Sequence, residues 1–119
     1  MSKLIAILAV PVLALSAPSA AQPALDLEQQ TALRCSAAFA IVAEMQARGE
    51  PAAAEYPQLG TRGREFFVRT SARLMDQAGL TRAQVTALLT REAEGLRTND
   101  NLDEVMPACL LLLEASGIR

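Results

Sequence analysis

Two cysteines, Cys35 and Cys109, carry the most distinctive chemistry in this chain of 119 residues. In an oxidising compartment, two cysteines most often join in one disulfide bond. A bond between these two closes a loop of about 75 residues and, on the chain-entropy model, stabilises the fold by roughly 4 to 4.5 kcal/mol. We therefore expect an intramolecular disulfide, with two buried free thiols or an intermolecular bridge as the alternatives.

The sequence contains no histidine. Histidine is the usual base of Ser-His and Cys-His nucleophilic catalysis and a common ligand of zinc, haem and copper. Close carboxylates such as Glu92 and Glu94, or Asp103 and Glu104, point to different sides of a helix and make poor acid–base pairs. We therefore predict no catalytic residue, no cofactor, no cofactor-binding residue and no metal site, and we expect that the protein is not an enzyme.

Three arginines form the one surface feature with a candidate binding role. Arg62, Arg69 and Arg73 follow one another at i, i+7 and i+11, so they line one stripe of a helix, and Glu65 can pair with Arg69. Such a stripe is a candidate interaction surface for an acidic partner or for anionic lipid headgroups. The alternative is an ordinary solvated face.

The chain begins with the three parts of a secretory signal peptide. Lys3 supplies the charge, residues 4–15 are an apolar run, and Pro18 and Ser19 lead to a cleavage site after Ala21. The run of about 12 residues is too short for a membrane-spanning helix, which needs roughly 20. We expect residues 1–21 to be removed; a buried core helix or an uncleaved anchor is the alternative.

Residues 22–119 are expected to form one domain with a core of modest size. The formal net charge of −2 gives no overall field that would attract nucleic acid, so no nucleic-acid partner is expected. No stable membrane insertion is expected once the leader is removed. The protein is then periplasmic or secreted, and its oligomeric state stays open, a homo-oligomer included.

Apolar spacing predicts an all-α fold, a compact bundle of about four helices whose first and last members are joined by the disulfide. No stretch both alternates apolar with polar residues and is rich in β-branched residues, as a strand is. A capping box at Thr81 and Gln84 is the clearest local signal. The predicted helices run from Asp26 to Arg48, from Thr61 to Ala78, from Thr81 to a polar turn at residues 98–101, and from Asn101 to Ser116.

Residue patterns also predict which elements are buried. The run of four leucines after Cys109 is apolar all round, so the last helix is expected to be the central core element. On the second helix, Phe67, Thr70 and Leu74 are expected to mark the core face, with Phe66 beside it. Tyr56, the sole tyrosine, is expected to hold its loop against the core.

The alanine-rich, arginine-rich composition resembles that of the many small uncharacterised exported proteins of GC-rich Gram-negative bacteria. This resemblance implies a location and no agreed activity. In outline, the export signal together with Cys35 and Cys109 also makes the chain similar to the small acid-stress chaperones of the periplasm. That architectural resemblance implies a protein that opens in acid and exposes apolar surface.

Two functional hypotheses follow from these observations. The first is a non-enzymatic periplasmic protein that binds an unknown protein partner in the cell envelope. The second is an envelope-stress chaperone of the acid-stress type. Without histidine, an acid switch here must come from carboxylates and act below about pH 5.

Overall fold

A computed structural model describes residues 24–119 as an all-helical bundle, as the sequence predicts. Within these residues there is no strand. The predicted signal peptide at residues 1–21 and its cleavage site after Ala21 lie outside the described residues. The elements in chain order are α1 (Leu27–Ala47), the short 3-10 helix η1 (Pro51–Ala53), α2 (Arg62–Ala78), α3 (Arg82–Thr98) and α4 (Leu102–Ala115).

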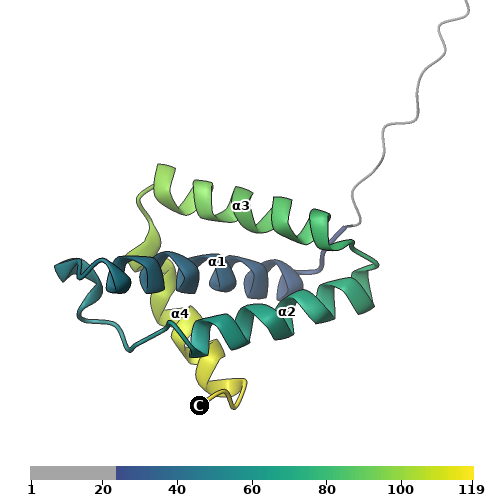
Figure 1. Cartoon of the computed structure of the whole chain (residues 1–119). Helices are drawn as coiled ribbons and strands as arrows, with labels where there is room; N and C mark the ends of the chain where they lie inside the picture. Colours follow the sequence, from purple (N-terminus) through teal and green to yellow (C-terminus); the bar gives the residue numbers. More distant parts are fainter. Residues whose placement is uncertain (1–23) are drawn as a thin grey trace, which may run out of the picture.

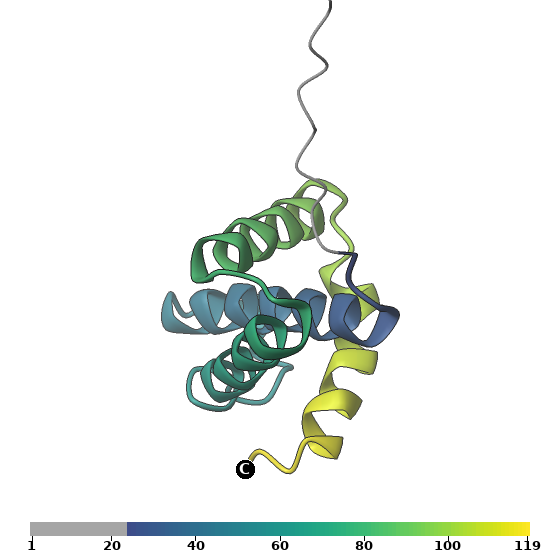
Figure 2. The same cartoon turned by 90° about the vertical axis from the view of Figure 1, so that its right-hand side faces the viewer.

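Helix α1 lies at the centre of the domain. Helices α2 and α3 flank it, and α4 crosses it on a further side (Figures 1 and 2). A helix that is apolar in most directions is stable in water when other elements surround it, and three helices surround α1. Its buried residues accordingly point in several directions: Leu33, Cys35, Ser36, Ala37, Ala38, Phe39, Ile41 and Val42.

The expectation that the last helix is the central core element is wrong. In α4, Met106, Cys109 and Leu113 are buried, whereas Leu111 in the middle of the leucine run is 73% exposed. The reason is the position of α4 at the edge of the bundle, where α1 is its main helical neighbour. One face of α4 is therefore covered, and the other meets water.

The helix boundaries follow the local signals in the sequence. Asp26 caps α1, and its carboxylate accepts a hydrogen bond from the Gln29 backbone N–H at 2.7 Å. The predicted capping box of Thr81 and Gln84 is confirmed at the start of α3. Gly79 ends α2 at a φ of 66°, a left-handed conformation that glycine adopts without strain.

The disulfide predicted between the first and last helices is confirmed. Cys35 of α1 and Cys109 of α4 are bonded across a separation of 74 residues, with their Cα atoms 5.2 Å apart. Both residues are buried in the main core cluster. Small domains have a total stability of about 5–15 kcal/mol, so a contribution of roughly 4 kcal/mol is a large part of it.

Helices α1 and α2 meet closely at Gly63. This glycine is buried, and a Cβ atom built on it would lie 3.0 Å from the Phe39 Cβ and 3.6 Å from the Leu59 Cβ. Real Cβ atoms rarely approach so closely, so the lack of a side chain sets the distance between the two helices at this point. The contact lies beside the edge-to-face pair of Phe39 and Phe66, whose ring centroids are 5.2 Å apart.

The close approach predicts that Gly63→Val destabilises the protein by about 1–3 kcal/mol, because the added atoms force α1 and α2 apart. Gly95→Val is the matched control, since Gly95 lies within α3 and has no heavy atom near its Cβ position. The control should change the free energy of unfolding by less than about 0.5 kcal/mol. Urea denaturation followed by circular dichroism measures both variants, and equal losses would contradict the assignment.

Candidate functional site

The described residues form an apolar groove between α2 and α3, and α1 provides the floor of one part of it. Two adjoining hollows of 290 and 400 Å³ make up the groove, and Phe67 lines both of them. We call this feature the α2–α3 groove. Its floor includes Phe39, Ala40 and Ala43; its α2 wall includes Arg64, Phe67, Val68, Ser71, Ala72 and Met75; its α3 wall includes Arg82, Val85, Thr86 and Leu89.

The α2 wall exists because α2 carries more apolar residues than its core face can bury. Phe66, Thr70 and Leu74 point to the core, whereas Phe67 is half-buried and lines the groove. The sequence pattern predicts Phe67 on the core face and Phe66 beside it. That prediction is wrong, because Phe66 lies in the core and Phe67 lies beside it. Val68, next to Phe67 on the groove wall, is 57% exposed.

The charge of the groove is one-sided. Arg64 lines the first hollow and Arg82 lines the second, and no acidic residue lines either of them. Neither guanidinium group forms an ion pair within residues 24–119. The arrangement is an apolar surface with an unneutralised positive charge in each hollow, which favours an apolar ligand that carries negative charge.

The predicted arginine stripe lies elsewhere on α2, and the structure places its members in different surroundings. Arg62 pairs with Glu114 at 2.7 Å and donates to the Ile118 carbonyl at 3.1 Å, so it ties α2 to the end of α4. Arg69 forms the predicted pair with Glu65. Two of the three guanidinium groups are thus engaged within the domain, and binding of a partner by this stripe stays a prediction.

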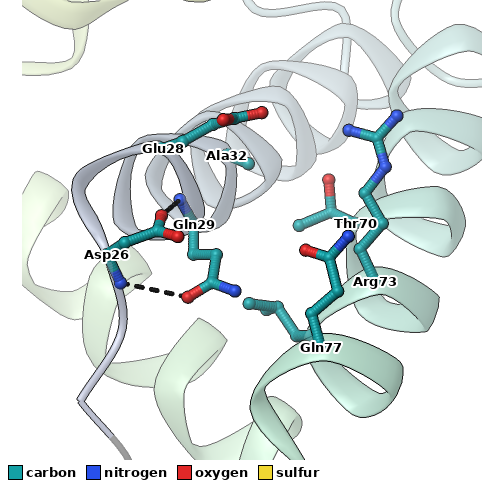
Figure 3. Close-up of a pocket in the computed structure, with 8 residues that line it drawn as sticks. Asp26, Glu28, Gln29, Ala32, Thr70, Arg73 and Gln77 are labelled. Atoms are coloured by element: carbon teal, nitrogen blue, oxygen red, sulfur yellow. Dashed lines mark hydrogen bonds between the residues drawn. The ribbon is translucent and has the colours of Figure 1, made fainter.

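The third member of the stripe, Arg73, lies beside a small polar pocket at the start of α1. Figure 3 shows its guanidinium group together with Thr70 and Gln77 on one side and the capping residues Asp26 and Gln29 on the other. The pocket has a volume of 40 Å³ and is lined by both signs of charge. It has room for about three water molecules, which is too little for an organic ligand of ordinary size.

The loop that leads from α1 to α2 is held in place by hydrogen bonds of two side chains, Gln46 and Tyr56. The Gln46 side chain accepts a hydrogen bond from the Leu59 backbone N–H at 3.0 Å and donates to the Pro57 carbonyl at 2.8 Å. The Tyr56 hydroxyl donates to the Asp103 carboxylate on α4, and its ring packs against the core, as predicted. These contacts fix Leu59 beneath the mouth of the groove.

Residues 24–119 contain no cluster of three or more metal-binding side chains of the His, Cys, Asp and Glu types. In the same part of the chain, no helix is both long enough and apolar enough to cross a bilayer. Comparison with known proteins finds no matching family, no matching curated protein and no matching solved structure.

The α2–α3 groove was not predicted from the sequence. The apolar run from Phe66 to Val68 was the one sequence signal that pointed to it.

The Tyr56 contact predicts a measurable pH dependence. Burial, aided by the hydrogen bond to Asp103, raises the pKa of Tyr56 to about 12 from an ordinary value of 10.0. Because the fold favours the neutral phenol, the stabilising contribution of Tyr56 is complete below about pH 10 and is lost as the pH rises through about 12. Absorbance at 295 nm reads this residue alone, since the chain has one tyrosine.

Asp103→Asn is the matched variant for this titration, because it removes the negative charge and keeps an acceptor. Its phenol should ionise at lower pH than that of the unaltered protein. Circular dichroism recorded at each pH establishes that the fold persists. If the folded, unaltered protein ionised Tyr56 at the same pH as the urea-unfolded chain, the predicted contact would be contradicted.

Proposed function

We propose that this protein is a non-enzymatic protein of the cell envelope that acts by binding a segment of another protein in the α2–α3 groove. The observation that carries the proposal is the exposed apolar character of this groove, with Val68 57% and Met75 39% exposed on its wall. Grouped apolar side chains on the surface of a soluble protein commonly mark an interaction site. The chain offers no histidine for catalysis, which favours binding over chemistry.

The construction of the groove also supports binding. Part of its floor is α1, which is packed on several sides and is joined to α4 by the disulfide. A site on such a rigid element loses little conformational freedom when a ligand binds. The disulfide in turn supports a location in an oxidising compartment such as the periplasm.

Site-specific photocrosslinking in the producing bacterium tests the proposal. A benzophenone amino acid placed at Val68 should yield a discrete adduct with one envelope protein. The yield should fall when Phe67→Ser replaces an apolar ring of the same wall with a polar side chain. Leu111 is the matched control position, because it is an exposed apolar residue of α4 outside the groove. Equal adducts from both positions, or none from Val68 in resting and stressed cells, would overturn the proposal.

A second candidate function, an envelope-stress chaperone that opens in acid, is favoured by the polar contacts between helices. Three of these contacts are ion pairs that need a charged carboxylate, so acid weakens these three together, and the fourth is a hydrogen bond from Tyr56 in the loop between α1 and α2. They are partly exposed, and each contributes about 0–1 kcal/mol at neutral pH. The contacts are Arg34 with Glu92, Arg97 with Glu44, Arg62 with Glu114, and Tyr56 with Asp103.

For this second function, lowering the pH from 7 to below about 5 should loosen α3 from α1 and α2 from α4, while the disulfide keeps α4 attached to α1. An environment-sensitive apolar dye should then gain fluorescence, and the protein should suppress aggregation of an acid-labile client. Glu92→Gln, which breaks the contact of α3 with Arg34, should move the transition to higher pH. Unchanged dye fluorescence and unchanged client aggregation across this range would remove the idea.

A further inference from the structure

We infer that the segment received by the α2–α3 groove is an amphipathic helix whose apolar stripe is bordered by acidic side chains. This inference rests on the proposed function and adds the chemical class of the partner. The shape of the groove, its charge and the occupants that this charge disfavours all support such a helix.

The shape of the groove fits a helix of about three turns. From Arg64 to Met75 the α2 wall rises by about 17 Å, at 1.5 Å per residue. A helix that docks in a groove presents anchors at i, i+3 or i+4 and i+7, which span about 10.5 Å, so the wall is long enough to receive all of them. The small side chains of Ala40 and Ala43 in the floor leave room for such anchors beside Phe67.

The charge of the groove selects the polar residues of that helix. Arg64 and Arg82 are the charged lining residues of its two hollows, and neither is neutralised by a described residue. Acidic side chains at both ends of an apolar stripe would meet one arginine each. Lysine or arginine at those positions would be repelled, so charge also gives specificity.

The same charge disfavours two other occupants. A second copy docked groove to groove brings arginines against arginines, because a two-fold interface repeats the same patch on both subunits. The apolar leader of the chain itself carries Lys3 as its one charged residue, so it has no acidic group for Arg64 or Arg82. A separate protein that supplies acidic residues fits the groove better than either.

Two stapled helical peptides of about 16 residues provide the test, because short helices need a staple to form in water. Both carry the same leucine stripe; one has glutamates at its borders and the other has lysines. Titrated against the full folded protein and followed by fluorescence anisotropy, the glutamate peptide should bind at least about tenfold more tightly. Its advantage should shrink as salt is added.

The double variant Arg64→Glu/Arg82→Glu should reverse this preference, and Arg64→Lys/Arg82→Lys should retain it. Arg91→Glu is the matched control, because Arg91 is exposed on α3, lies outside the lining of the groove and also has no ion pair within the described residues. It should leave the preference unchanged. Circular dichroism verifies that each variant is folded.

Several outcomes would overturn the inference. Equal binding of the two peptides, no binding of either, or a preference that survives charge reversal would each reject an acidic helix as the ligand. Sedimentation equilibrium adds a further outcome, since self-association that Phe67→Ser abolishes would assign the groove to a second copy. If crosslinks from Val68 to another protein persist in such a case, the proposed binding function stands and the partner class alone is wrong.

Discussion

Helix α1 is apolar on several sides between Leu33 and Val42, and the architecture follows from the need to cover it. Helices α2, α3 and α4 each pack against α1 more extensively than the outer helices pack against one another. The disulfide adds a covalent link to the same helix at Cys35, so the central element is also the best-anchored one. The positions of α2, α3 and α4 are therefore set by their packing against α1.

The groove is a result of this arrangement. Helices α2 and α3 are joined by a short connection at residues 79–81. They lie on different sides of α1 and leave part of α1 uncovered between them. The glycine at position 63 lets one end of α2 lie close to the Phe39 side chain, and both residues line the groove there. The same helices, α2 and α3, therefore pack the core with one face and line the groove with another.

Much of the fold was predictable because its signals are local. The caps at Asp26 and Thr81 and the left-handed Gly79 set helix ends through a few neighbouring atoms, and oxidised cysteines pair when only two are present. The groove was not predictable, and neither was the extent to which α4 is buried, because both depend on where the helices lie in space. A shift from Phe66 to Phe67 turns a side chain by about 100° around the helix, enough to exchange core for groove.

The disulfide has a consequence for the chain once it is exposed to proteases. Cys35 precedes and Cys109 follows both the loop from Arg48 to Thr61 and the turn between α3 and α4. Loops of this kind are the preferred places for proteolytic nicking. A single cut in either of them leaves two fragments that remain one covalent molecule, so a nicked copy keeps its pieces at high effective concentration and can retain its shape.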